Sequence, residues 1–111
     1  MIKVEAIVHE FRLDDVKAAL KSLGCDRVVI SGVFLNRPHG PKSKYRGIEY
    51  TPDLPKIKVE TCVSAYRAQE VVDELARVAR TGDDDSMILT YEIADAILVH
   101  DRRRLEWSLS D

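Results

Sequence analysis

The feature that most constrains this chain is a pair of alternating segments, each followed by a helical pattern. Residues 56–63 alternate strictly between polar and apolar side chains, and residues 2–8 begin in the same way. A period of two is typical of a strand with one buried face. Residues 16–23 then place apolar side chains at i, i+3, i+4 and i+7, and residues 68–79 carry a second such stripe. The pattern predicts two strand-then-helix units.

The ends of these helices carry their own signals. Asp14 and Asp15 place acidic groups where a first turn favours them, and Gly24 and Gly82 follow the two apolar stripes, so we expect them to end the helices.

Three further segments complete the chain order. Residues 27–35 are β-branched and apolar, residues 87–93 read as another strand, and residues 94–100 read as a short strand or edge segment. The order β-α-β-β-α-β predicts an α+β, ferredoxin-like fold, in which two helices cover one face of a four-stranded antiparallel sheet. We expect the other face to present apolar residues and to pack on sister subunits.

Residues 36–55 separate two of the expected strands. They contain all four prolines of the chain, two glycines, four Lys or Arg residues and a histidine. Such a stretch is too irregular for one element and too long for a tight turn, so we expect a long projecting loop. Residues 101–111 begin with aspartate and three arginines and are expected to form a C-terminal tail.

Length and charge exclude several classes of protein. The 111 residues fit one domain, 1–111, and 17 basic against 19 acidic side chains leave a net charge of −2. No global positive field recruits nucleic acid or anionic lipid. Apolar stretches such as residues 96–99 are far shorter than the roughly 20 residues that span a bilayer. We expect a cytoplasmic protein, not embedded in a membrane, with Cys25 and Cys62 as buried thiols rather than a disulfide.

Several runs of residues match one family in order and spacing. The chain opens with MIKVEAIVHEFRLDDVKAALKSLG, continues with YRGIEY and LPKIKVE at residues 45–60, and reaches VVDELARVARTG at residues 71–82. Over residues 1–100 the chain resembles the PII signal-transduction proteins. YRGIEY followed by LPKIKVE is the specific part, because a generic ferredoxin-like sheet gives no reason for that run.

The resemblance implies a homotrimer with three projecting loops and effector sites in clefts between subunits. Family members sense adenine nucleotides and, with magnesium, 2-oxoglutarate. Their loops dock on membrane transporters or enzymes of nitrogen and carbon metabolism. They act by binding, so no enzyme activity is expected.

The motif positions give candidate residues for both roles. For the loop that meets the partner they are Arg37, Tyr45, Arg46 and Tyr50. Tyr50 occupies the position that some members uridylylate, although we expect an unmodified tyrosine. The effector-binding positions are Ile7, Val33, Phe34, Lys56, Thr81 and Gly82.

The chain departs from the family where phosphates are bound. Asp83–Asp85 follow Thr81-Gly82 in place of a run with glycines and a lysine. Two like charges about 4 Å apart cost on the order of 1–4 kcal/mol, so these carboxylates disfavour a triphosphate. Leu98 and His100 stand where the family carries arginines. Arg102–Arg104 follow closely, but we expect a solvated tail there.

The start of the loop departs as well. Residues 33–40 lack the glutamine that helps family members hold magnesium and 2-oxoglutarate. Lys56 is retained, but without its partner it gives little support for that ligand. We therefore expect ADP or AMP as the effector, rather than ATP with 2-oxoglutarate, and no cofactor.

Other functions remain as alternatives. His9, His39 and His100 have no ligand spacing, so no metal is expected, and Asp83–Asp85 are expected to form a solvated turn. Neither cysteine has a histidine neighbour that would suggest nucleophilic catalysis. The alternatives to a sensor are a trimeric interaction scaffold that has lost nucleotide binding and a metal-binding trimer.

Overall fold

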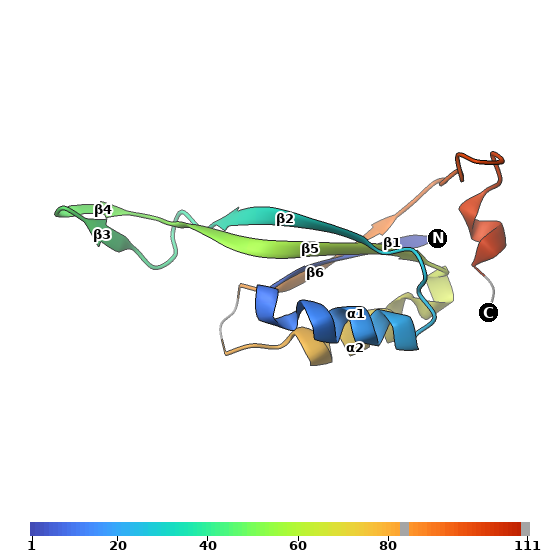
Figure 1. Ribbon diagram of the computed structural model, residues 1–111, viewed down its shortest axis with the longest axis horizontal. Coiled ribbons are helices and arrows are strands. Elements are labelled where there is room, and N and C mark those ends of the chain that lie inside the picture. The colour runs from blue at the N-terminus through green and yellow to red at the C-terminus, as the bar shows by residue number, and fades with distance from the viewer. Residues whose placement is uncertain (83–84, 110–111) are drawn as a thin grey trace.

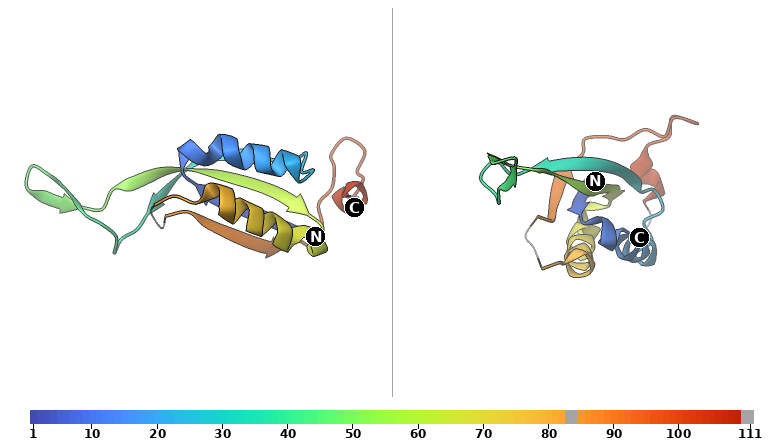
Figure 2. Two further views of the ribbon diagram at one scale, coloured as in Figure 1. Left: turned by 90° about the horizontal axis from the view of Figure 1, so that it is seen from below. Right: turned by 60° about the vertical axis from the view of Figure 1, so that its left-hand side comes forward.

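The computed structural model describes residues 1–82 and 85–109 and has two helices against one face of a sheet (Figures 1 and 2). The sheet has the order β2-β5-β1-β6. Every neighbouring pair in it is antiparallel. This arrangement confirms the ferredoxin-like α+β fold. The elements are β1 (Ile2–Val8), α1 (Leu13–Ser22), β2 (Val29–Asn36), β5 (Asp53–Val63), α2 (Ala68–Ala79) and β6 (Met87–Glu92).

The core lies between the sheet and the two helices. Alternate residues of β1 and β5 point toward the helices and are buried, which is the geometry that a period of two predicts. The helices contribute side chains spaced by three and four residues, which share one face. The buried core consists of Val4, Ala6, Val8, Val59 and Val63 from the sheet and Val16, Leu20, Val71, Leu75 and Ala79 from the helices.

The two helices end differently. Gly24 follows α1 with a φ of 81°, its N–H donates to the Lys21 carbonyl, and the Cys25 N–H donates to the Leu20 carbonyl. This is the Schellman arrangement that Gly24 predicts. The expectation that Gly82 ends the second helix is wrong, because α2 stops at Ala79 and Arg80 is already extended.

Each helix follows a short 3-10 turn, and the two turns match in sequence. Phe11 and Arg12 lie in η1 (Glu10–Arg12), and Tyr66 and Arg67 occupy the same places in η2 (Ala65–Arg67). Each arginine pairs with an acidic residue in the first turn of its helix, Arg12 with Asp15 at 3.5 Å and Arg67 with Glu70 at 3.7 Å. The two halves of the fold therefore begin their helices in the same way.

The loop between β2 and β5 contains a hairpin that the sequence analysis did not predict. β3 (Ser43–Tyr45) pairs with β4 (Ile48–Tyr50) across Arg46 and Gly47, which have φ values of 52° and 80°. Positive φ at both central residues is what a type I′ turn requires. Below it, β5 is longer than expected, since it begins at Asp53, whereas β2 is shifted along the chain, beginning at Val29 and reaching Asn36.

The hairpin gives the molecule an elongated shape (Figure 1). Its extents are 57 × 27 × 21 Å and its radius of gyration is 16.7 Å. A compact domain of this length has a radius of gyration of about 13 Å. The hairpin therefore projects away from the packed part of the chain.

The sheet face opposite the helices is more polar than expected. On β1 and β5 it carries charged side chains, with Glu60 accepting ion pairs from Lys3 at 3.8 Å and Lys58 at 3.3 Å. Apolar side chains share this face at Ile7 and Leu89. The prediction of an apolar open face is therefore wrong for most of β1 and β5, because their apolar positions are used by the core.

The chain after β6 forms no further strand. In residues 94–100 the structure has only a single bridge, between Ile97 and Arg104, so the expected edge strand is absent from this segment. The tail then makes the 3-10 turn η3 (Leu105–Ser108), and Leu105 is buried. Arg102–Arg104 remain exposed. No helix in the described part of the chain combines the length and the apolar character that crossing a bilayer requires.

Candidate functional site

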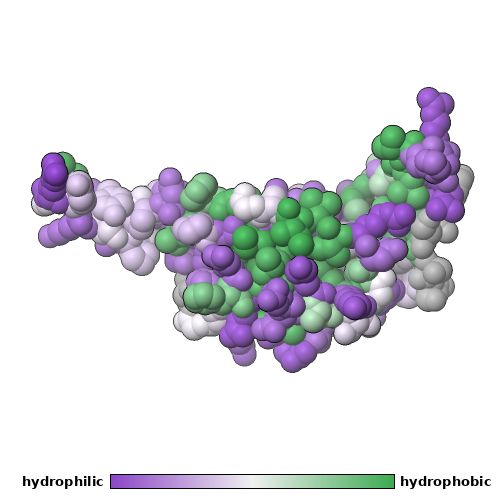
Figure 3. All heavy atoms as spheres, viewed as in Figure 1, coloured by the Kyte–Doolittle hydropathy of each residue, from purple (hydrophilic) through white to green (hydrophobic). Residues whose placement is uncertain are grey.

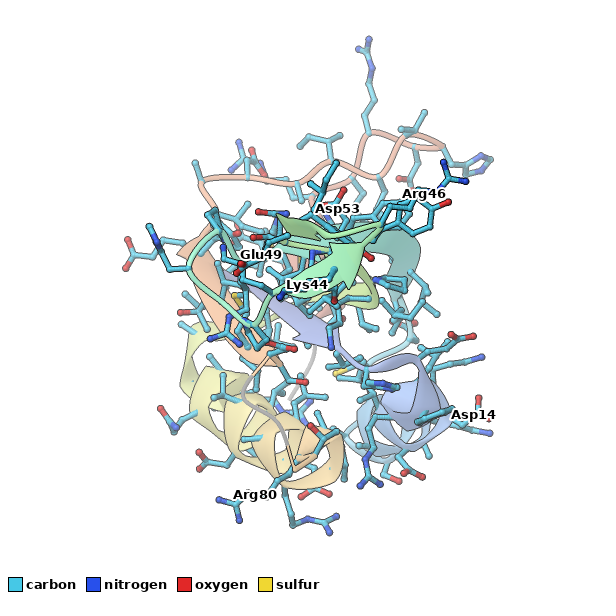
Figure 4. The ribbon with its side chains drawn as sticks, turned by 90° about the vertical axis from the view of Figure 1, so that its left-hand side faces the viewer. Asp14, Lys44, Arg46, Glu49, Asp53 and Arg80 are labelled. Atoms are coloured by element: carbon cyan, nitrogen blue, oxygen red, sulfur yellow. The ribbon has the colours of Figure 1, made fainter. Side chains whose placement is uncertain are left out.

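The hairpin presents aromatic and basic side chains to solvent. Tyr45, Ile48 and Tyr50 are all exposed, and the Arg46 guanidinium lies 5.3 Å from the centre of the Tyr45 ring. The space-filling view shows that this end of the molecule is largely hydrophilic (Figure 3), and the end-on view shows Lys44, Arg46 and Glu49 on it (Figure 4). Three of the four residues predicted for the partner loop, Tyr45, Arg46 and Tyr50, thus lie in the hairpin.

Polar contacts join the two arms below the hairpin. The Asn36 side-chain amide donates to Asp53 Oδ1 at 2.8 Å, and these residues are also partners in the β2–β5 register. Lys42 Nζ donates to Thr51 Oγ1 at 2.6 Å. The base of the hairpin is therefore a paired structure rather than a free coil.

Arg37, the fourth predicted partner-loop residue, lies at this base and reaches a different segment. Its Nη1 contacts Asp85 Oδ1 at 2.7 Å, and Lys56 Nζ lies 3.8 Å from Asp85 Oδ2. The Lys56 side chain is only 4% exposed and the Asp85 side chain 12%. The prediction of a solvated acidic turn is wrong for Asp85, because its carboxylate pairs with these two cations. Asp83 and Asp84 lie outside the described residues.

The predicted effector residues come together only in part. Val33 is the register partner of Lys56, and Ile7 is the partner of Lys58, so these three predicted residues line one face near the hairpin base. Phe34 points to the opposite face of the sheet and is 76% exposed.

Thr81 belongs to a hollow beside this cluster. It lines a cavity of about 340 Å³ together with Arg80, Ser86 and Met87, while Gly82 is exposed just beyond it. The Ser86 hydroxyl is buried and finds no hydrogen-bond partner among the described atoms. The cavity is also lined by apolar side chains of β1, α2 and β6, and it shares no residue with the Arg37–Asp85–Lys56 contacts, although Ser86 directly follows Asp85. The hairpin base, Lys56 and the turn before β6 therefore lie at the same end of the sheet.

The opposite end of the sheet holds a cavity that the sequence analysis missed. Its volume is about 410 Å³, and it lies where β5 continues past the first residue of β2. The tail lies beside this end of the sheet (Figure 1) and contributes Leu105 and Leu109. Other lining residues include Lys3, Arg27, Glu60 and Arg67.

Both cysteines, Cys25 and Cys62, line this cavity and are free thiols. Burial raises the pKa of both thiols, and the Arg67 and Lys3 charges offset it only in part. No spacing motif in the sequence pointed to this region, because the two cysteines lie far apart in the chain.

The described residues contain no group of three or more His, Cys, Asp or Glu side chains that could hold a metal ion. His9 instead accepts a hydrogen bond from the Phe11 N–H at 3.2 Å and packs on the Phe11 ring.

Comparison with known proteins identifies the family. Residues 1–103 match the family model described as nitrogen regulatory protein P-II. The nitrogen regulatory protein P-II of Rhodospirillum rubrum is 34% identical over 107 residues, covering 94% of this chain and 96% of that protein. The protein of the same name from Synechocystis is 44% identical over 85 residues, covering 75% of this chain and 76% of its own. Nitrogen regulatory protein P-II 1 of Escherichia coli is 36% identical, with 89% and 91% covered. The chain belongs to the nitrogen regulatory protein P-II family.

Proposed function

We propose that this chain is a signal-transduction regulator that senses an adenine nucleotide and controls a partner protein through its hairpin. Family membership supports the regulatory role and supports action by binding rather than by turnover. The type of nucleotide, the kind of partner and the trimeric assembly are each argued separately below.

The observation that carries the proposal is the contact between the hairpin base and the turn before β6. Arg37 follows the last residue of β2, and its partner Asp85 lies in the segment that also holds Thr81. A ligand that binds beside Thr81 would therefore change the environment of Asp85 and, through Arg37, of the hairpin. Coupling of this kind needs a contact between the two segments, and the ion pair supplies it.

The charge at this site favours a nucleotide with few phosphates. Asp85 places a carboxylate beside Lys56 and Arg37, so part of their positive charge is already neutralised. Arg80 and the Ser86 hydroxyl line the neighbouring cavity and remain suited to an anion. ADP or AMP, which carry less negative charge than ATP, fit this balance better.

The hairpin surface suits a protein partner. Its exposed aromatic rings offer apolar area at low entropic cost, and Lys44 and Arg46 offer charge. On the resemblance to the family, the partner is a membrane transporter or an enzyme of nitrogen or carbon metabolism. The same resemblance supports a homotrimer, in which the open sheet faces lie against one another.

Isothermal titration calorimetry of the purified protein with ATP, ADP and AMP, each with and without magnesium, tests the nucleotide proposal. We expect micromolar binding of ADP or AMP and weaker binding of ATP. The absence of heat with all three nucleotides would contradict it.

A scaffold that has lost nucleotide binding is the second candidate. One observation favours it, because the Arg37–Asp85–Lys56 contacts need no ligand to complete them. In that case calorimetry shows no binding while the protein still assembles and still captures its partner.

A further inference from the structure

We infer that Asp85 is a built-in anionic occupant of the cation pair Arg37 and Lys56, and that it holds the base of the hairpin in place when no effector is bound. The inference goes beyond the proposed function, because it describes the free protein and requires no nucleotide.

The burial of Lys56 supplies the first step. An ammonium group with 4% of its side chain exposed must be compensated by a nearby anion or by hydrogen bonds, since desolvation otherwise strongly disfavours its charged form. The Asp85 carboxylate lies 3.8 Å from it and is itself 88% shielded from solvent, given its 12% exposure. Screening by salt is weak in such a place.

The same carboxylate contacts a second cation. Its other oxygen lies 2.7 Å from Arg37 Nη1, a distance typical of a charge-assisted hydrogen bond. One carboxylate thus spans a residue of β5 and the first residue after β2, and it comes from a third segment of the chain. This geometry is the one that a bound carboxylate or phosphate would adopt on the same two cations.

The position of Arg37 connects the Arg37–Asp85 ion pair to the base of the hairpin. Arg37 directly follows the Asn36–Asp53 pair that closes the two arms, and its carbonyl accepts from the Gly40 N–H at 2.8 Å. Fixing the Arg37 side chain therefore restrains the first turn of the loop as well as the end of β2. Release of that side chain would loosen one arm of the hairpin base.

Any anionic ligand of these two cations competes with the Asp85 carboxylate. A small carboxylate or phosphate that binds to Arg37 and Lys56 must displace Asp85, because the three groups already share one site. Without a ligand, Asp85 therefore holds the hairpin base, and a bound anion would replace the Asp85 carboxylate on Arg37 and Lys56.

Limited proteolysis without nucleotide tests the inference. Trypsin can cut the hairpin after Lys42, Lys44 and Arg46, whereas the Arg37 bond precedes Pro38 and is resistant, so Arg37→Gln removes no useful cleavage site. We expect Arg37→Gln to raise the rate of hairpin cleavage about three- to tenfold. Asp85→Asn should have a similar effect, and the double variant should add little to either. Arg37→Lys should restore part of the protection.

Two control variants carry the same charge changes elsewhere. Arg77→Gln alters an exposed arginine on α2 whose guanidinium pairs with Glu74, and Asp14→Asn alters an exposed aspartate on α1, which Figure 4 shows away from the hairpin. Both should leave hairpin cleavage unchanged. Hydrogen exchange of β1 amides reports whether a variant has loosened the whole fold.

Three results would overturn the inference. They are equal cleavage of Arg37→Gln and the parent protein, equal acceleration by Arg77→Gln, or faster cleavage that accompanies faster exchange throughout β1. If Asp85→Asn fails to fold, Arg37→Gln alone tests the inference. The Arg37 side chain is 39% exposed, and its substitution leaves the Lys56–Asp85 contact intact. A negative nucleotide titration would not affect this test, which uses the free protein.

Discussion

Lys56 carries its charge in a nearly dry place, and the residues around it account for the chemistry of the hairpin base. The resemblance to the family predicts Lys56 as an effector contact, and the structure adds that its charge is met by Asp85. Sequence reasoning could not find this pair. The residues lie in separate segments, with no periodic spacing between them, and the run of three aspartates suggested a solvated turn.

The asymmetry of this ion pair gives a stability prediction. Asp85→Asn leaves a buried ammonium without its carboxylate, whereas Lys56→Met leaves Asp85 still paired with Arg37. We expect the first variant to lower the free energy of unfolding by about 1–3 kcal/mol and the second by less than about 1 kcal/mol. Urea unfolding measures both values, with Asp14→Asn as a control expected within about 0.5 kcal/mol of the parent. A larger loss in Lys56→Met than in Asp85→Asn would refute the assignment.

The two thiols lead to a prediction about reactivity and pH. Because burial raises the pKa of Cys25 and Cys62, little thiolate is present near neutral pH. A disulfide reagent at pH 7.5 should modify the folded protein at least about tenfold more slowly than the urea-unfolded protein. Equal rates in the two states would show that the thiols are not shielded.

The same shift predicts how stability depends on pH. An unfolded cysteine titrates near its ordinary value of about 8.5, while the folded thiols stay protonated to higher pH. Above that pH the folded state therefore binds more protons than the unfolded state. The stability that the protonated thiols contribute is fully present below the unfolded pKa and is lost as pH rises through the folded pKa. Replacing both cysteines by alanine should flatten the fall in urea stability above about pH 8.5.

At the scale of elements, periodicity predicted the packed part of the chain well and the hairpin poorly. The two alternating segments and the two apolar stripes correspond to β1, β5, α1 and α2 because burial against a common core imposes those periods. β3 and β4 are three residues each and none of their residues is buried, so no buried face marks them in the sequence. Arg46-Gly47 is a less familiar turn pair than Asn-Gly, although Gly47 suits the same geometry.

The end of α1 allows a sharp test of local structure. Gly24 has a φ of 81°, and an added Cβ would meet nothing closer than Arg67 at 4.0 Å, so Gly24→Ala introduces backbone strain without a steric clash. We expect a loss of about 1–2 kcal/mol in the free energy of unfolding. Gly32→Ala is the matched control, since Gly32 has open space and no positive φ, and it should be neutral or slightly stabilising. Equal effects at the two positions would contradict the Schellman assignment.

For the whole molecule, the fold could be predicted from the order of its elements, but the open sheet face could not. The alternation in residues 56–63 predicted that one face of β5 packs in the core. The opposite face, away from the helices, carries charge at Lys58 and Glu60. Apolar surface instead gathers toward the edge strand β2, where Val29 and Ile30 are exposed (Figure 3). The arrangement of the effector residues also depends on tertiary structure, because Val33 and Phe34 are neighbours in the chain and yet point to opposite faces.

Assembly can be tested through the mass of the protein in solution. If the open faces meet in a homotrimer, light scattering should give about three times the chain mass of 12.6 kDa. Leu89→Asp places a charge on the open face and should shift the protein toward the monomer. Ala18→Asp, on the exposed side of α1, should leave the mass unchanged. A parent protein that runs as a monomer at micromolar concentration would contradict the proposed assembly.

We expect the hairpin and the turn before β6 to respond together to a bound nucleotide. Hydrogen exchange with and without saturating ADP measures this most directly, using peptides that cover residues 36–55 and 80–87 together with peptides from α1. We expect ADP to change exchange in both segments, and we expect Arg37→Gln to remove the change in residues 36–55 while leaving that in residues 80–87. Binding of ADP that alters residues 80–87 but leaves residues 36–55 of the parent protein unchanged would contradict it.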